Sequence, residues 1–208
     1  MLPEIYLASI NKIESFFIFN FDITNIHTMT NSITELNISN KGFTQLPDDI
    51  VKYTNLIKLD CSWNKITSLD NLPPTLTILD CSYNKITSLD NLPPTLTELH
   101  CQCNNITSLD NLPPTLTKLY CNNNKLTSLD NLPPTLIKLS CYDNQITSLD
   151  NLPPTLTELY CQDNQLTSLD NLPTTLSTLC CEYNPFIYDF EPTLENIRKY
   201  NASRNISS

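Results

Sequence analysis

Leucine, isoleucine and cysteine recur along most of the chain with a period of twenty residues. Each unit follows the pattern L-x-x-L-x-C-x-x-N-x-L, which residues 156–166 show in full as LTELYCQDNQL. Around the second Leu and the Cys, apolar and variable positions alternate, which predicts a short β-strand with one buried face. A twenty-residue period predicts a solenoid in which every unit contributes one strand and one turn-rich return segment.

The repeats span residues 33–184. Residues 33–55 form a longer, atypical unit in which Lys41 takes the place of the framework Asn. Six units then match the pattern without an insertion, and a partial seventh follows. These units start at residues 56, 76, 96, 116, 136, 156 and 176.

Both ends of such an array need a cap, because a terminal repeat leaves its core open. We expect residues 1–32 to form the N-terminal cap, with a helix near 3–13 and a strand near 15–21. Residues 185–208 are expected to form the C-terminal cap. Within them, apolar residues three apart predict a short amphipathic helix over 191–200, followed by a polar tail.

Two polar-looking columns have structural explanations. Seven of the nine cysteines are spaced by twenty residues, so we expect reduced thiols packed in a row inside the core, where ligands for zinc would instead have to converge on a point. The framework Asn column, from Asn64 to Asn184, is expected to bond backbone groups where the chain leaves each strand. The cysteine column comprises Cys61, Cys81, Cys101, Cys121, Cys141, Cys161 and Cys181.

The decapeptide TSLDNLPPTL stands verbatim in five units. Its two prolines favour an extended, polyproline-like return on the convex side of the solenoid. Its Asp forms a column that suits either Ca²⁺ or a turn. We favour the turn, with each carboxylate accepting backbone N–H groups near Leu72, and expect no metal or other cofactor. The column comprises Asp70, Asp90, Asp110, Asp130, Asp150 and Asp170.

Composition narrows the function further. The formal net charge of −10 argues against nucleic acid or an anionic membrane as the partner. No apolar stretch has the length of a membrane span, and the first residues do not read as an export signal. The chain has a single glycine and no phosphate-binding loop, and neither of its two histidines belongs to a recognisable catalytic triad, so we expect no enzymatic activity.

The units differ from one another mainly at positions that the stacking does not fix. These positions lie on the outward side of each strand and just after it, and several hold aromatic residues suited to anchoring a partner. They predict a protein-binding surface on the concave face of the sheet. The candidate binding residues are Lys58, Asp60, Trp63, Asp80, Tyr83, Glu98, His100, Lys118, Tyr120, Lys138, Tyr142, Glu158 and Tyr160.

The string LPPTLTELYCQDNQLTSL resembles the short leucine-rich repeats of bacterial type III effectors, and the variant with Cys in the strand is similar to repeats of giant amoeba-infecting viruses. This resemblance implies a leucine-rich repeat arc of β-strands and coil with little helix. We expect a module that binds a protein and is itself a monomer. Because no export signal is visible, we expect it inside a cell, in the host cytoplasm if the source is viral. The start MLPEIY resembles an F-box, so a substrate adaptor for ubiquitin ligation is an alternative. An enzyme is the third hypothesis.

Overall fold

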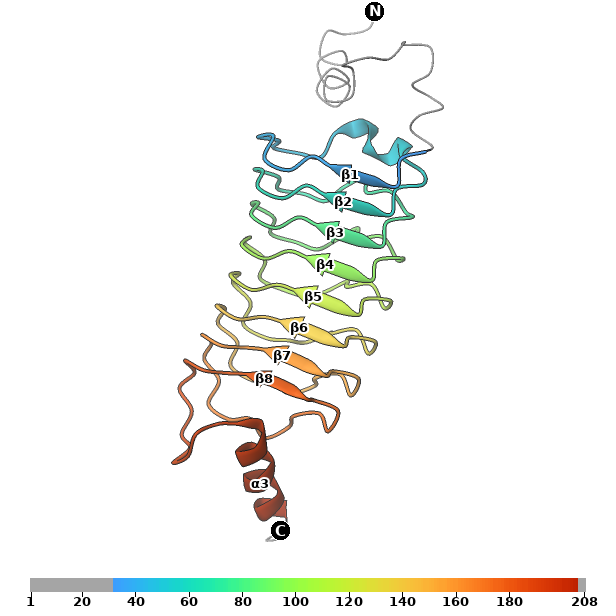
Figure 1. Ribbon diagram of the computed structural model, residues 1–208. Coiled ribbons are helices and arrows are strands. Elements are labelled where there is room, and N and C mark those ends of the chain that lie inside the picture. Colours follow the sequence, from blue (N-terminus) through green and yellow to red (C-terminus); the bar gives the residue numbers. More distant parts are fainter. Residues whose placement is uncertain (1–31, 206–208) are drawn as a thin grey trace, which may run out of the picture.

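The computed structural model describes residues 32–205. The expected helix near 3–13 and strand near 15–21 lie outside these residues. Eight parallel strands form one sheet in chain order, each hydrogen-bonded to the next (Figure 1). They are β1 Glu35–Asn37, β2 Lys58–Asp60, β3 Ile78–Asp80, β4 Glu98–His100, β5 Lys118–Tyr120, β6 Lys138–Ser140, β7 Glu158–Tyr160 and β8 Thr178–Cys180. The predicted repeat solenoid is confirmed.

The strand register follows the sequence period. Each framework Leu pairs with the framework Leu of the next unit, as Leu99 does with Leu119. Its side chain points into the core, while the residues on either side of it point outward. We call the surface formed by those flanking residues, together with the short turn after each strand, the outer face. It carries the residues for which the sequence predicts a concave binding surface. Equivalent residues of successive units are therefore neighbours on the outer face.

The core lies between the sheet and the return segments and consists of stacked Leu, Ile and Cys side chains. The framework Leu and Cys of the central units are fully buried, as Leu119 and Cys121 show. All seven cysteines of the predicted column are buried and unpaired, so they pack as small apolar groups. Burial, which disfavours the thiolate, raises the pKa of Cys121 to about 12.

The framework Asn column bonds the backbone as predicted. In the central repeats, the Asn104 amide nitrogen donates to the carbonyls of Cys81 and Cys101 at 3.0 and 3.1 Å. Its side-chain oxygen accepts the N–H of Ile86 at 2.9 Å. One buried side chain thus bonds backbone groups of two successive units where the chain turns away from the strand.

The return segments are extended, with short turns at the Asp-Asn and Pro-Thr steps, as the proline content predicts. The second Thr of the decapeptide forms hydrogen bonds between neighbouring units. The Thr95 hydroxyl is within hydrogen-bond distance of the carbonyl oxygens of Pro74 and Leu76, 2.8 Å from each. Thr115, Thr135, Thr155 and Thr175 make equivalent contacts.

The partners assigned to the Asp column from sequence were wrong. The Asp90 carboxylate accepts the Ser88 hydroxyl of its own unit and the side-chain amide of Asn111 in the next unit, the latter at 2.8 Å. These two hydrogen bonds outweigh a small desolvation effect and lower the pKa of Asp90. The Asp column therefore ties units together side chain to side chain, and the backbone near Leu72 is not its partner.

Two helical elements sit at the ends of the described array. The longer first unit forms the 3-10 helix η2 Asp48–Lys52 after Pro47. At the other end, α3 Leu194–Asn205 confirms the expected capping helix, with two corrections: it starts after Glu191 and runs on through the segment expected to be a polar tail. Its N-terminus is capped by the Thr193 hydroxyl, which accepts the N–H of Asn196 at 3.2 Å.

The last unit, which starts at residue 176, has no regular return segment. Polar residues of α3 supply the contacts that this segment makes in the other units. Arg198 donates to the carbonyls of Thr174 and Leu176 at 3.0 and 2.6 Å, which are the positions that a Thr hydroxyl clips elsewhere. Arg204 pairs with the Asp170 carboxylate, the position that an Asn amide occupies in the other units. At the end of the array, the carbonyls and the Asp carboxylate that Thr and Asn side chains bind in other units are thus bound by arginines of α3.

Candidate protein-binding surface

All thirteen candidate residues lie on the outer face, and none of them is buried. Trp63, Tyr83 and Tyr142 stand in the turns that follow their strands, and the others flank the framework Leu within the strands. The structure therefore brings them onto one side of the sheet. Their contacts divide them into a self-paired part, over β4 to β7, and an open part, over β2 and β3.

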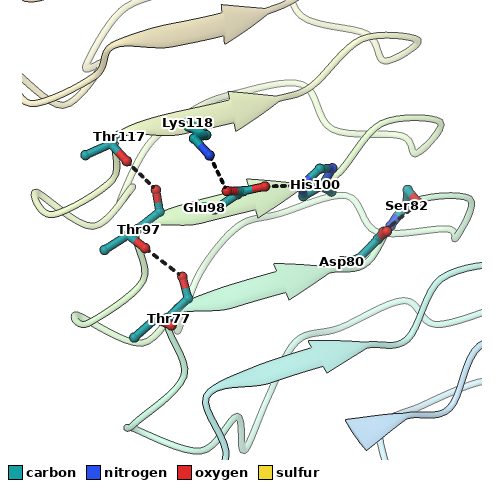
Figure 2. A network of polar contacts seen from close by, with 8 residues as sticks. All are labelled: Thr77, Asp80, Ser82, Thr97, Glu98, His100, Thr117 and Lys118. Carbon is teal, nitrogen blue, oxygen red and sulfur yellow. Dashed lines mark hydrogen bonds and ion pairs between the residues drawn. The ribbon is translucent and has the colours of Figure 1, made fainter. Parts of the chain in front are cut away.

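An ion-pair group joins β4 and β5 in the self-paired part. Glu98 contacts His100 at 2.8 Å and Lys118 of the next strand at 2.9 Å (Figure 2). Partial burial opposes ionisation of Glu98, but its two hydrogen bonds outweigh the burial and lower its pKa. The His100 ring stacks on Tyr120, with ring centroids 4.3 Å apart. These side chains satisfy one another across the strands.

Lys138 fills a gap further along the same face. The unit that follows Tyr120 carries the small Ser140 at the ring position, and the Lys138 ammonium lies between the two flanking rings. It is 5.7 Å from the Tyr120 centroid and 5.2 Å from that of Tyr160, within the range of a cation–π contact. The Lys138 ammonium also forms an ion pair with the Glu158 carboxylate, with 2.9 Å between Nζ and Oε2. The strand residues of the outer face from β4 to β7 thus pair their charges with one another beside aromatic rings.

Trp63 and Tyr83 form an open aromatic pair after β2 and β3. Their rings stack with centroids 3.9 Å apart and planes 9° from parallel. Trp63 remains 59% exposed and Tyr83 41% exposed, so the stack leaves much of both rings open to solvent. Because each Trp or Tyr ring is large, rigid and amphipathic, exposed pairs of this kind suit the contact of a partner.

The backbone at these two rings is in the left-handed region, with φ of 55° at Trp63 and 53° at Tyr83. The same slot holds Asn123, Asp143 and Asp163 in other units, with similar angles. Asn and Asp tolerate this conformation, whereas a bulky residue there costs on the order of 1–3 kcal/mol. The fold therefore imposes the conformation on every unit, and the units of Trp63 and Tyr83 carry exposed aromatic rings there despite its cost.

Two neighbouring carboxylates lie three residues before these rings, at the ends of β2 and β3. Asp60 and Asp80 are register partners on adjacent strands. Asp60 accepts bonds from Ser62 and from the Asn37 amide, and Asp80 accepts bonds from Ser82. Among residues 32–205, no Lys or Arg forms an ion pair with either of them. The open part of the outer face is therefore acidic as well as aromatic.

The list of candidates from sequence omitted one exposed ring. Tyr183 continues the turn column of Trp63 and Tyr83, has φ of 57° and is 81% exposed. Its alignment with the other units would have identified it. In the column just after each strand, Ser62 and Ser82 are buried under their Asp partners, so these two units offer no surface there.

Two cysteines, Cys103 and Cys180, lie outside the cysteine column, and both are partly exposed and free. Cys180 precedes the buried Cys181, and burial together with the nearby Glu182 raises the pKa of its thiol, which disfavours the reactive thiolate. Within residues 32–205, no group of three His, Cys, Asp or Glu is arranged to hold a metal ion. No helix in that part of the chain is long and apolar enough to cross a membrane.

Comparison with known proteins agrees with this geometry. A family model described as "Leucine Rich repeats (2 copies)" matches residues 74–114 and 94–134. No curated protein matches the chain by sequence. Among solved structures, YopM from Yersinia enterocolitica WA-314 is 34% identical with a TM-score of 0.68, over 78% of this chain and 40% of that one. The leucine-rich repeat domain of a Shigella effector is 28% identical with a TM-score of 0.67, over 86% and 79%.

A third solved structure shares the cysteine feature. The functional domain of InlJ from Listeria monocytogenes, which includes a cysteine ladder, is 35% identical with a TM-score of 0.58. The match covers 76% of this chain and 41% of that one, so this chain spans less than half of the YopM and InlJ structures.

The fold and the matches together define a solenoid of the kind that typically serves as a protein–protein interaction module, generally without catalysis. The chain has the leucine-rich repeat fold, and its repeats resemble those of bacterial effectors.

Proposed function

We propose that this protein is a non-catalytic module that binds another protein on its outer face, and that the target is a protein of a host cell in whose cytoplasm it acts. The observation that carries the proposal is the placement of exposed aromatic rings on left-handed backbone, at Trp63 and Tyr83. A position under no demand but folding and solubility would hold Asn or Asp, as other units do. Strained, exposed side chains are typical of functional surfaces.

The rest of the outer face supports the same function. Between β4 and β7, the Glu98–Lys118 and Lys138–Glu158 pairs and the stack of His100 on Tyr120 are formed before any partner arrives. A partner therefore meets pre-ordered side chains and pays less side-chain entropy on binding. The size of the face, eight strands wide, suits a folded protein better than a small ligand.

Site-directed crosslinking tests this proposal. A photo-reactive phenylalanine analogue is placed at Tyr120 or at Tyr160 on the outer face, and at Thr127 in an exposed return segment as the matched control. Amoebal lysate is the first choice, because of the resemblance to repeats of amoeba-infecting viruses. The expected result is one shared partner from both outer positions and none from Thr127. Equal capture from all three positions, or from Thr127 alone, would refute it.

A further inference from the structure

On the outer face, strand carboxylates without a cation occur together with exposed stacked rings over β2 and β3. Over β4 to β7, each acidic strand residue already has its cation: Glu98 has Lys118, and Glu158 has Lys138. In the latter group the ammonium also lies between two tyrosine rings. This group shows, within the chain itself, how a cation, a carboxylate and aromatic rings fit together on this face.

The open part over β2 and β3 has the rings and the carboxylates but no such cation. Trp63 and Tyr83 are stacked and exposed, and Asp60 and Asp80 stand on adjacent strands three residues before them. The basic residues nearest in sequence are Lys58, Lys65 and Lys85, and none forms an ion pair with Asp60 or Asp80. All three are exposed.

We propose that this patch, defined by Asp60, Asp80, Trp63 and Tyr83, receives an arginine or lysine side chain of the protein partner. The inference rests on the proposed function and names the chemistry of its contact. A guanidinium or ammonium on the exposed rings gains a cation–π contact, and the two carboxylates complement its charge. Arginine fits best, because its planar group stacks on rings and bonds carboxylates in a bidentate manner.

A direct test uses the fluorescence of Trp63, which is the only tryptophan in the chain. The full protein is titrated at low salt with a blocked tetra-arginine peptide, and separately with the tetra-citrulline peptide, which has the same shape without the charge. The expected result is a saturable change in Trp63 emission with tetra-arginine only. Equal binding of tetra-citrulline, or no change with either peptide, would overturn the inference.

Matched charge variants separate local binding from general attraction to a negative protein. Asp60→Asn with Asp80→Asn changes the net charge by the same amount as Asp143→Asn with Asp163→Asn at the far end of the turn column. We expect the first pair to weaken peptide binding by about tenfold and the second to have little effect. Equal weakening by both pairs would show non-specific attraction and refute the patch.

Tyr83→Asn removes one ring without a new demand on the backbone, because Asn123 holds the same slot in another unit. We expect weaker peptide binding with an unchanged fold, checked by its unfolding midpoint.

Failure of this inference can be distinguished from failure of the proposed function. A partner that crosslinks to the outer face but binds the Asp60→Asn/Asp80→Asn protein with unchanged affinity overturns this inference alone. Absence of outer-face crosslinks overturns the proposed function.

Discussion

Removal of one framework Asn tests how the stack is held together. In Asn104→Ala, the Ile86 N–H loses its acceptor, and the carbonyls of Cys81 and Cys101 lose a donor. The site is buried between units, so water cannot easily replace the amide. The buried Ile86 N–H, left without an acceptor, costs about 1–3 kcal/mol. The two carbonyls keep one donor each, Asn84 and Asn124, and their weakened bonding adds about 1–2 kcal/mol together, which gives a total loss of about 2–5 kcal/mol.

Urea unfolding followed by circular dichroism measures this loss. With a slope of about 2 kcal/mol per molar urea, the midpoint should fall by about 1–2.5 M. The control is Asn105→Ala, since Asn105 is the adjacent residue and its position holds Lys or Gln in other units. It should change stability by less than about 0.5 kcal/mol. If the two variants unfold within that margin of each other, the side-chain ladder is not what holds the units.

Three further predictions concern the cap and the ionisable columns. Arg198→Ala should destabilise the last unit by about 1–2 kcal/mol, because two carbonyls lose a charged donor, and hydrogen exchange of the Leu176 region reports it. The pKa of Asp110 is lowered by its bonds from Ser108 and Asn131, so its stabilisation is complete above pH 3.8 and is lost as the pH falls further, as acid titration of the melting temperature should show. The pKa of Cys121 is raised from 9.0 to about 12, so stability should fall as the pH rises from 9, as alkaline unfolding would show.

Each of these predictions has its own control. Lys199→Ala removes only an exposed pair with Glu195 on the same helix, and an equal effect would contradict the capping role of Arg198. Asp110→Asn should show a shallower acid loss, and an unchanged slope would remove that carboxylate from the account. Cys121→Ala should likewise flatten the alkaline loss, and the same slope as in the unaltered protein would argue against a buried thiol.

The sequence was sufficient for the fold because the same side chains repeat at every level of the structure. A strand face with Leu99 and Cys101 recurs every twenty residues, and stacking leaves one register in which each buries its own copy. Asn104 was assignable for the same reason, since a polar residue inside an apolar column must bond the backbone.

The errors fell where a contact joins different residue types in different units. Nothing local to Asp90 indicates that its partner is Asn111, twenty-one residues away. The extension of α3 was missed because Arg204 and Asn201 bond the array rather than form an apolar stripe. On the outer face, sequence located the slots, but the division into paired and open parts depends on where Lys138 reaches.

The central claim is that stacked framework residues hold the fold while the variable outer slots bind the partner. One variant tests it: Trp63→Asn, Tyr83→Asn, Tyr120→Ser and Tyr160→Ser, in which each replacement is the residue found at the same slot of another unit, Asn123 or Ser140. The measurement is its affinity for the crosslinked partner beside its urea midpoint. The account predicts an affinity lower by about a hundredfold or more, with cooperative unfolding retained. Unchanged affinity, or loss of the folded state, would contradict it.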